Sequence, residues 1–386
     1  MIYLDNAATT GVMPLGVKKA VANAINNLSA NPGRSGHMVA QRAGEAIYKT
    51  RLQVADLFSS DSQSVVFTPN CTQAINYVIK GVLQEGDHVI ISSMEHNAVA
   101  RPIHRLKTDG VIDYDIAQVI MGDSEATIRS FERLIRPNTK LIISLHGSNV
   151  TGELMPIKEL AKCCRDRGIL FAVDAAQTAG VIPINMREIG IDFLFIAPHK
   201  GLYAPMGTGI LIAEKPIEKT IIEGGTGSYS NLLSQPDELP DRLESGTVNL
   251  PGIMGISAGI DFLNNVGIDK IYSHEKQFCR VLCDELKSIS GVSVFSALAE
   301  AELGAPVVSF NIDGLTSMET AELLSKKGIA VRAGLHCAPL AHLTIGTADI
   351  GTVRVSPSYF NKHSDIFLLK RAIFDIKKAK NIAKRY

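Results

Sequence analysis

A lysine, Lys200, is placed where a reactive amine would be useful. It lies between an apolar run of strand type at 193–197 and a second apolar run that begins after Gly207. An amine buried among apolar neighbours loses proton affinity, becomes nucleophilic at neutral pH and can form a Schiff base with an aldehyde cofactor. The alternative interpretation is a solvated lysine in a hairpin turn.

An aspartate upstream favours the reactive lysine. Asp174 ends the apolar part of the strand-like run 169–177, and a helix and a strand fit into the 26 residues that separate it from Lys200. A buried carboxylate there would keep a pyridine nitrogen protonated, which makes pyridoxal phosphate an electron sink. Asp174 alone would also suit a helix N-cap. Together the two residues predict a pyridoxal-phosphate site.

The segments that must position these residues alternate between strand and helix. Expected strands are 64–70, 88–93, 140–149, 169–177 and 193–197. Expected helices include 15–28, 38–58 (after a loop at 31–37), 71–83 and 157–168. This order predicts an α/β fold with a mostly parallel sheet covered on both faces. Because ligands bind beyond the carboxyl ends of such strands, we expect the polar clusters there to converge on one site: TPNCT, MEHNA, GSN, DAAQ and APHK.

The pattern changes after Pro251. Two helices, expected at 252–263 and 272–288, lead to short strands, a further helix and a lysine-rich C-terminal helix. We therefore expect a large cofactor-binding domain at 15–254. A smaller α+β domain would contain 255–386 together with residues 1–14.

Composition excludes several classes of function. Lys+Arg and Asp+Glu number 39 each, so the formal net charge is zero and no nucleic-acid-binding face is expected. No apolar run is long enough to cross a membrane, and MIYLDNAATT lacks the features of a signal peptide. The sequence predicts a soluble cytoplasmic protein.

The six cysteines show no zinc-type CxxC pairs. Cys279 and Cys283 lie one helical turn apart, which is more typical of a buried helix face than of a metal site. Thiols stay free in the cytosol, so we expect no metal and no disulfide. Each cysteine is then either core or reactive.

A set of dispersed motifs resembles a known family. The segments are AVDAAQ, SSMEHNA, IAPHKGLYAPMGTGIL, ESGTVNLPG and VRAGLHCAPL. They resemble the fold-type I pyridoxal-phosphate enzymes of aminotransferase class V, and within them the Suf-type (group II) cysteine desulfurases. The resemblance extends from LDNAATT at the start to VRVSPSYFN near the end. It implies a homodimer that converts L-cysteine to L-alanine and passes the sulfur to an acceptor protein.

The resemblance assigns the cofactor ring to four residues. Lys200 matches the lysine that binds the cofactor aldehyde, and Asp174 matches the partner of the pyridinium nitrogen. Gln177 matches the residue that hydrogen-bonds the ring hydroxyl. His96 matches an imidazole that stacks on the ring and shuttles protons.

The cofactor phosphate is expected at the start of the helix that begins near Cys71, where free N–H groups and the helix dipole favour an anion. Thr72 and His199 match further phosphate partners. Gly246 and Thr247 match a segment that reaches the phosphate of the neighbouring subunit, which implies a dimer with shared sites.

The substrate is expected to meet Asn149, Arg354 and Cys337. Asn149 and Arg354 match the positions that bind the α-carboxylate, although Arg354 would also suit a surface ion pair. Cys337 matches the cysteine that takes the substrate sulfur as a persulfide, and its spacing of 17 residues from Arg354 is short, as in group II. Arg332 lies close by in sequence, and a nearby cation favours the attacking thiolate. The alternative for Cys337 is a small buried apolar residue.

Two positions depart from the family pattern. Ala197 replaces a serine that contacts the phosphate, and loss of such a bond weakens binding by about 1.5–3 kcal/mol. Leu335 replaces a second histidine beside the thiol, which affects how Cys337 is activated.

Other functions remain open at this point. Selenocysteine lyase, an amino-acid epimerase or another class V lyase would retain Lys200, Asp174 and Arg354. Of these, selenocysteine lyase would also use Cys337 in the same way. A non-catalytic scaffold that binds a sulfur carrier would instead lack the absorbance of a bound cofactor.

Overall fold

The larger sheet carries the predicted lysine and aspartate. The computed structural model describes residues 1–32 and 36–383, so the loop expected at 31–37 lies partly outside the described residues. Within that part of the chain the sheet has seven strands in the order β2-β8-β7-β6-β5-β3-β4. They are β2 (Val65–Thr68), β3 (Asp87–Ser92), β4 (Ile112–Ala117), β5 (Thr139–Leu145), β6 (Leu170–Asp174), β7 (Phe193–Ile196) and β8 (Gly209–Ala213). β8 is antiparallel to β2 and β7, and the other pairs are parallel, which confirms the mostly parallel sheet.

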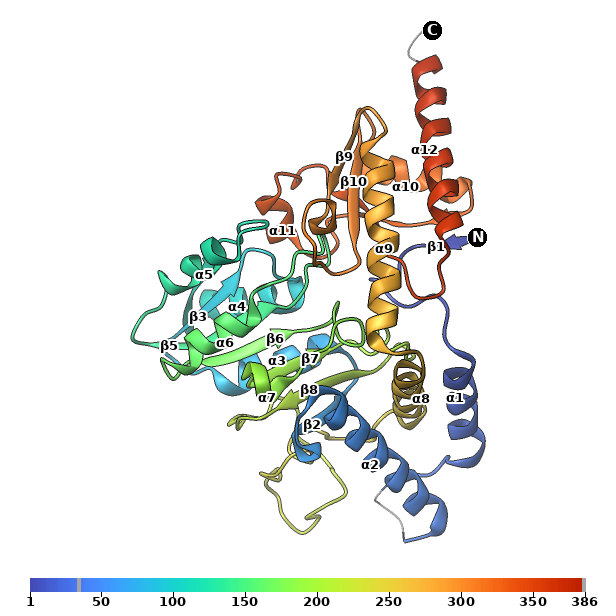
Figure 1. Cartoon of the computed structure of the whole chain (residues 1–386). Helices are drawn as coiled ribbons and strands as arrows, with labels where there is room; N and C mark the ends of the chain where they lie inside the picture. The colour runs from blue at the N-terminus through green and yellow to red at the C-terminus, as the bar shows by residue number, and fades with distance from the viewer. Residues whose placement is uncertain (33–35, 384–386) are drawn as a thin grey trace.

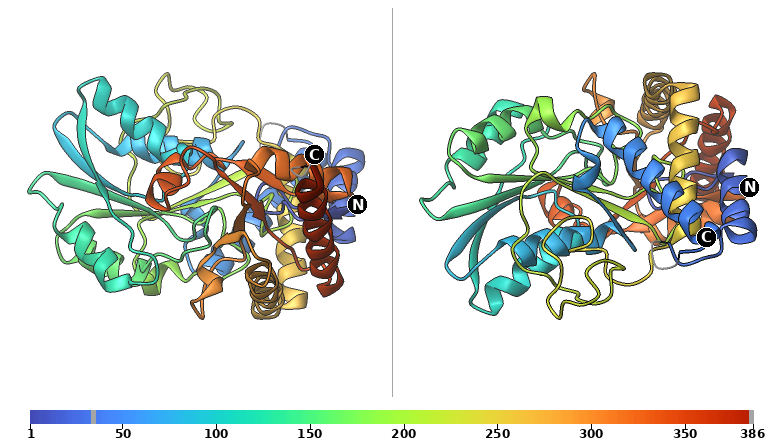
Figure 2. Two further views of the ribbon diagram at one scale, coloured as in Figure 1. Left: turned by 90° about the horizontal axis from the view of Figure 1, so that it is seen from above. Right: turned by 90° about the horizontal axis from the view of Figure 1, so that it is seen from below.

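Helices cover both faces of this sheet (Figure 2). On β5, Leu141 and Ile143 pack into one cluster of buried residues, whereas Ile142 between them packs into the other. Because successive strand residues point to opposite faces, an apolar run such as LII must be buried on both sides. The helices before and between the strands are α1 (Leu15–Asn27), α2 (Met38–Phe58), α3 (Cys71–Val82), α4 (Asn97–Thr108), α5 (Ser124–Glu132), α6 (Ile157–Arg165) and α7 (Met186–Ile189).

A smaller antiparallel sheet lies at the other end of the molecule (Figure 1). Its strand order is β12-β13-β10-β9, and a separate short pair joins β1 to β11 in parallel. The strands are β1 (Ile2–Tyr3), β9 (Val292–Phe295), β10 (Val308–Ile312), β11 (Ile329–Ala330), β12 (Arg332–Gly334) and β13 (Thr352–Val355). The helices of this part are α10 (Ser317–Lys326), α11 (Pro339–Thr344) and α12 (His363–Ala383). A third cluster of buried residues joins α10 and α12 to the smaller sheet and includes Leu4 from the chain start, whereas α11 packs into a cluster of the larger sheet through Ala341.

Two consecutive helices connect the parts. α8 (Leu250–Val266) buries Ile253, Ile256 and Ile260 in a cluster of the larger sheet. α9 (Ile268–Lys287) rises from that level to the smaller sheet (Figure 1), with Ile271 in the same cluster and Phe278 in the third. The predicted domain boundary after residue 254 falls inside α8, and the division into two domains stays a prediction.

The sequence pattern predicts neither α4 nor β4. β4 is an edge strand whose four middle residues, Asp113 to Ile116, are only partly buried, so it lacks the apolar run of the central strands. α4 contains Pro102 and several basic residues, which weaken the helical pattern in the sequence. Both elements depend on packing against β3 and α3.

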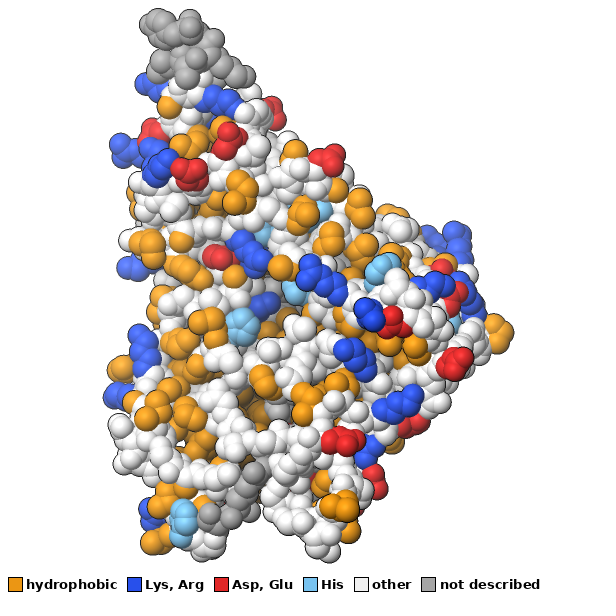
Figure 3. Space-filling view, turned by 180° about the vertical axis from the view of Figure 1, so that it is seen from behind, with side chains coloured by type: hydrophobic (Ala, Val, Ile, Leu, Met, Phe, Trp, Pro, Cys, Tyr) orange, Lys and Arg blue, Asp and Glu red, His pale blue; other side chains and the backbone are white. Residues whose placement is uncertain are grey.

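The surface is mixed in character. Acidic and basic side chains are interspersed on the face shown in Figure 3. No helix among the described residues is long and apolar enough to span a membrane.

Candidate active site

The polar clusters at the carboxyl ends of the strands do converge. They surround a cavity of about 210 Å³ between the larger sheet and the antiparallel pair β12–β13. Nine of the predicted site residues line it: Cys71, Thr72, His96, Asn149, Asp174, Gln177, His199, Lys200 and Arg354. Arg332 and His336 from the other part of the molecule also line it, as do Ala7 and Ala8 near the chain start. Two predicted residues, Cys337 and Thr247, lie outside this lining.

Lys200 is presented by a tight turn between β7 and β8. Its N–H donates to the carbonyl of Ala197 at 3.1 Å, and its own carbonyl accepts from the N–H of Tyr203 at 3.0 Å. The hairpin of the alternative interpretation is therefore real, but the lysine faces the cavity instead of bulk water. Burial lowers the pKa of the Lys200 amine, and the Asp174 charge opposes this shift. The amine is thus easier to deprotonate than a surface lysine.

Asp174 is the last residue of β6 and is buried. One carboxylate oxygen, Oδ1, accepts a hydrogen bond from the N–H of Ala176 at 2.9 Å and lies 4.0 Å from Sγ of Cys71. Burial raises the pKa of Asp174, while the Lys200 charge acts in the other direction. A second cation beside this carboxyl would favour its charged form.

Two histidines in the cavity have a lowered pKa. His96 caps α4 by accepting from the N–H of Ala98 at 3.0 Å through Nδ1, and burial followed by the Lys200 charge lowers its pKa to about 4. His199 also has a pKa of about 4, mainly because of burial. Its buried Nδ1 has no hydrogen-bond partner among the described residues. Both rings are therefore neutral at pH 7.

The N-terminus of α3 opens into the cavity. Asn70 caps the helix by accepting from the N–H of Gln73 at 2.9 Å, and Cys71 and Thr72 form the first turn. β8 begins directly against this cap, since a Cβ at Gly209 would lie 2.2 Å from the Asn70 carbonyl carbon. Ala197 is buried in the same lining, so the expected serine hydroxyl is replaced by a methyl group.

Arg354 is the largest fully buried side chain of the lining. Its Nη2 lies 2.9 Å from Oδ1 of Asp5, its Nη1 donates to the carbonyl of Asn149 at 3.1 Å, and its Nε has no partner among the described residues. The side chain of Asn149 donates to the carbonyl of His336 at 2.8 Å and leaves its own Oδ1 without a partner there. The buried environment contradicts the surface ion pair considered for Arg354. The Arg354 Nε donor and the Asn149 Oδ1 acceptor therefore remain without partners among the described residues.

Cys337 is exposed, which contradicts the interpretation as a buried apolar residue. His336 and Cys337 both have left-handed backbone angles, with φ of 50° and 57°. The thiol accepts a hydrogen bond from Nη2 of Arg332 at 3.3 Å, and the Cys337 carbonyl accepts from the N–H of Asn97 at 2.7 Å. Since Arg332 also lines the cavity, it connects the thiol to the site.

Thr247 lies apart from Lys200 within the chain. It is exposed and lines a separate pocket of about 160 Å³ with Gln73, Tyr77 and Asn249. The segment around it is anchored by Glu244, whose two carboxylate oxygens pair with the guanidinium of Arg51 at 2.9 Å each.

Two acidic residues that contact residues of the lining were not predicted. Asp5 belongs to the quoted LDNAATT motif, yet nothing in that motif indicates an ion pair with Arg354. Glu95 is fully buried, accepts from Ser92 Oγ at 2.5 Å and from the N–H of Leu145 at 2.9 Å, and burial raises its pKa to about 8. Its neighbour in the quoted MEHNA motif received a role, but Glu95 did not. Among the described residues, no group of three or more His, Cys, Asp or Glu side chains is arranged to hold a metal ion.

Comparison with known proteins agrees with this geometry. The family described as aminotransferase class-V matches residues 2–369. A probable cysteine desulfurase of Methanothermobacter thermautotrophicus is 32% identical over 97% of this chain and 94% of its own length. One of Xylella fastidiosa (strain Temecula1) is 33% identical over 98% of this chain and 91% of its own.

Solved structures lead to the same family. An apo cysteine desulfurase of Thermococcus onnurineus NA1 superposes with a TM-score of 0.89 and 29% identity, covering 98% of this chain and 95% of that one. The cysteine desulfurase CsdA of Escherichia coli gives a TM-score of 0.87 and 26% identity, covering 98% and 94%. These matches confirm the fold and the family resemblance, and the chain belongs to the aminotransferase class V family.

Proposed function

We propose that the protein is a pyridoxal-phosphate-dependent cysteine desulfurase of the Suf type. It would convert L-cysteine to L-alanine and keep the sulfur as a persulfide on Cys337. The observation that carries the proposal is one cavity in which Lys200 and Asp174 face Arg354, with Arg332 connecting this cavity to the exposed thiol. The cysteine desulfurases among the similar proteins support the choice of reaction.

The residues present fit pyridoxal phosphate. The start of α3 and the unpartnered Nδ1 of His199 suit a phosphate, while the buried Asp174 carboxyl suits a pyridinium nitrogen. Gln177 and His96 line the same cavity and would contact the ring hydroxyl and the ring face. When bound, the cofactor supplies the electron sink for a bond broken at the substrate α-carbon.

The chain's own residues would bind the amino acid and move its protons. The substrate carboxylate would accept hydrogen bonds from the Arg354 guanidinium, whose Nε lacks a partner in the described structure, and from the second N–H of Asn149 Nδ2, whose other N–H donates to the His336 carbonyl. The Lys200 amine takes the α-proton at Nζ, because its lowered pKa leaves more of it in the neutral form. His96, neutral at pH 7, is available to move a second proton.

The sulfur step uses Cys337 as the nucleophile. Its thiolate attacks the substrate sulfur, a sulfur–sulfur bond forms, and the bond between the substrate β-carbon and sulfur breaks. The β-carbon keeps the electron pair and gains a proton, so alanine and a persulfide result and the reaction needs no outside oxidant. The persulfide then passes to a sulfur-acceptor protein or to an added thiol.

We further propose a cytoplasmic homodimer. Gly246 and Thr247 are exposed and do not line the Lys200 cavity of their own chain. This position suits a contribution to the phosphate site of the partner subunit. The anchoring of this segment by the Arg51–Glu244 pair supports a defined contact surface.

The deciding experiment is incubation with L-cysteine and a thiol reductant, with sulfide and alanine measured together. The proposal expects equal amounts of both. Selenide release from selenocysteine without sulfide from cysteine would assign a selenocysteine lyase, and racemised cysteine without sulfide would assign an epimerase.

The cofactor assignment has its own test. The purified protein should be yellow, and borohydride should fix the cofactor to the peptide that contains Lys200. Lys200→Ala should lose this adduct, whereas Lys215→Ala, a nearby lysine outside the cavity, should keep it. Recovery of the adduct on another lysine in the wild type would contradict the assignment.

A further inference from the structure

Tyr203 closes the turn that presents Lys200. Its N–H donates to the Lys200 carbonyl at 3.0 Å, and its own φ of 55° lies in the left-handed region. A bulky residue adopts such an angle rarely and keeps it where the surroundings hold it. The contacts of Tyr203 therefore decide whether the turn stays in this shape.

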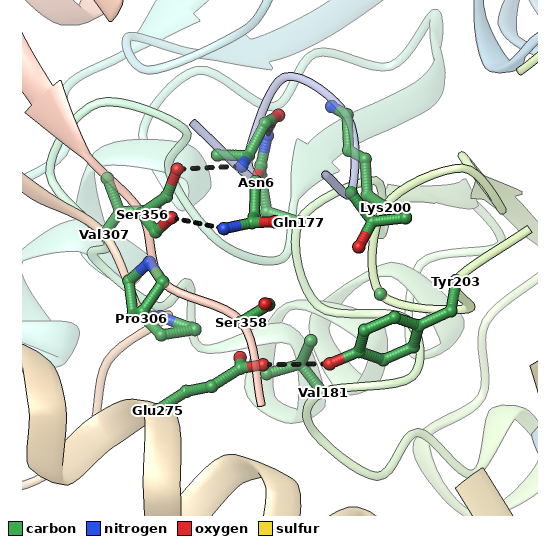
Figure 4. Close-up of a pocket in the computed structure, with 14 residues that line it drawn as sticks. Asn6, Gln177, Val181, Lys200, Tyr203, Glu275, Pro306, Val307, Ser356 and Ser358 are labelled. Carbon is green, nitrogen blue, oxygen red and sulfur yellow. Dashed lines mark hydrogen bonds between the residues drawn. The ribbon is translucent and has the colours of Figure 1, made fainter. Parts of the chain in front are cut away.

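The Tyr203 hydroxyl is held from two directions. It donates to Oε1 of Glu275 at 3.3 Å and accepts from the N–H of Tyr359 at 3.2 Å. Figure 4 shows Glu275 reaching Tyr203 on the side of the Lys200 turn away from the lysine amine. Glu275 belongs to α9, and Tyr359 follows β13, the strand that carries Arg354. One hydroxyl thus connects the lysine turn with the part of the chain that carries the arginine.

The Tyr203 ring is fixed as well. It meets the ring of Phe262 at 5.0 Å and that of Phe360 at 5.8 Å, both edge to face. The backbone beside it has no free space, since a Cβ at Gly259 would lie 2.0 Å from the Leu202 carbonyl oxygen. The turn cannot shift without disturbing α8 or the turn after β13.

We propose that Tyr203 and Glu275 form a positioning pair that aligns Lys200 with Arg354. Neither member of the pair lines the 210 Å³ cavity. Both line a smaller pocket of about 40 Å³ (Figure 4), which shares Ala7, Gln177 and Lys200 with the cavity, so the pair acts on the cavity through these shared residues. The inference rests on the proposed function, in which Lys200 is the lysine that holds the cofactor. Glu275 is buried and is not otherwise used by that function.

The pair has a pH-dependent member. Burial raises the pKa of Glu275 to about 8, while hydrogen bonds from the Tyr203 hydroxyl and the Tyr359 backbone act against this shift. The titratable groups beside it are the phenol of Tyr203 and the thiol of Cys279, one helical turn further on α9. Glu275 is therefore mostly protonated at pH 7 and becomes a buried carboxylate above pH 8, which changes the bond to Tyr203.

The first test replaces the hydroxyl. In the holoenzyme, Tyr203→Phe should lower the visible circular dichroism of the bound cofactor, which reports how firmly the cofactor is oriented. The kcat for cysteine should fall about tenfold, as for one lost hydrogen bond, and KM should change less than about twofold. The control is Tyr272→Phe on α9, the helix that carries Glu275. The Tyr272 hydroxyl donates to the Gly304 carbonyl at 3.1 Å. This control variant should keep the wild-type dichroism and kcat.

The second test removes the titration and keeps the shape. Glu275→Gln should match the wild type at about pH 6.5, where Glu275 is protonated, and should lack the change in cofactor dichroism that the wild type shows around pH 8. Wild-type dichroism and kcat in Tyr203→Phe would overturn the proposal, as would an unchanged step near pH 8 in Glu275→Gln. If Tyr203→Phe does not fold, the pH profile of Glu275→Gln decides. The dichroism is measured before cysteine is added. If the wild type releases no sulfide but Tyr203→Phe still alters the cofactor dichroism, the proposed activity is refuted and the positioning role of Tyr203 and Glu275 is supported.

Discussion

The Lys200 amine and the Asp174 carboxyl share one cavity, and each affects how readily the other holds a proton. Burial lowers the pKa of the lysine and raises that of the aspartate, while their opposite charges work against both shifts. Both groups are thus less charged than on a surface. A cofactor that binds the amine covalently would remove the buried ammonium charge, and its cationic nitrogen near the carboxyl would stabilise the buried carboxylate.

The role of Cys337 is testable at this scale. Cys337→Ser should still bind the cofactor, because Lys200 and Asp174 are unchanged, but turnover should fall by orders of magnitude since a serine hydroxyl is a poor attacker of sulfur. Mass spectrometry of the wild type after cysteine should show added sulfur on the Cys337 peptide. Cys163→Ser, in a buried position on α6, is the control and should remain active. Full activity in Cys337→Ser, or a persulfide only on Cys71, would move the enzyme to another class of lyase.

Glu95 predicts a pH dependence of stability. Its folded pKa of about 8 lies above the unfolded value, so the contribution is full below about pH 4.5 and is lost as the pH rises through 8. Between these two pH values, Glu95 lowers the free energy of unfolding by about 1.4 kcal/mol for each unit that the pH rises. The melting temperature of the cofactor-free protein should therefore fall less from pH 5.5 to 7.5 in Glu95→Gln than in the wild type. The exposed Glu300→Gln should behave like the wild type, and an equal fall in all three proteins would refute the prediction.

At the scale of elements, close packing fixes the loop that carries the lysine. α8 approaches the segment after Lys200 so closely that Gly259 has no room for a side chain. The same helix buries Ile256 and Ile260 in the core of the larger sheet. Its position is thus set by the core, and the lysine turn must adapt to it.

This packing gives a matched pair of glycine variants. Gly259→Ala should destabilise the protein by about 1–3 kcal/mol, because its new methyl group would meet the Leu202 carbonyl. Gly16→Ala in α1 has nothing within 4 Å and should be neutral or stabilise by up to about 1 kcal/mol. Thermal unfolding followed by far-ultraviolet circular dichroism measures both changes. Equal stability of the two variants would show that α8 can move away from the turn.

At the scale of the whole molecule, the cavity is formed by segments from both ends of the chain. Asp5 pairs with Arg354 across 349 residues of sequence, and Leu4 packs in the core of the smaller sheet. α9 extends from one part to the other and has buried residues in both cores (Figure 1). The relative position of the two parts therefore sets the distance between Lys200 and Arg354.

The shared-site dimer is tested on the intact protein. Light scattering should give the mass of two chains, and dilution to monomers should release the cofactor. Thr247→Ala should stay dimeric and lose cofactor affinity by about tenfold or more, as for one hydrogen bond to a charged group. Thr108→Ala, whose hydroxyl bonds within α4, should change neither property. A monomer with full cofactor occupancy would contradict the shared site.

Local sequence patterns predict the succession of the central strands and helices along the chain and most of the residues of the cavity. The apolar runs around Ile142, Val173 and Phe195 indicated strands buried on both faces, and chain alternation with helices left few sheet topologies. Since parallel strands end at one edge of the sheet, the pattern predicts one site that contains Asp174, His96 and Lys200. These inferences depend on local patterns, which sequence records directly.

Contacts between segments far apart in the chain could not be predicted from such patterns. The Arg354–Asp5 ion pair, the Tyr203–Glu275 bond and the burial of Glu95 join residues whose own neighbours in sequence give no sign of the partner. The edge strand β4 and the reversed direction of β8 were likewise settled by pairing with neighbours. The physical reason is that burial and ion pairing depend on what the folded chain brings from elsewhere, so the same glutamate or arginine in an exposed place would have no such role.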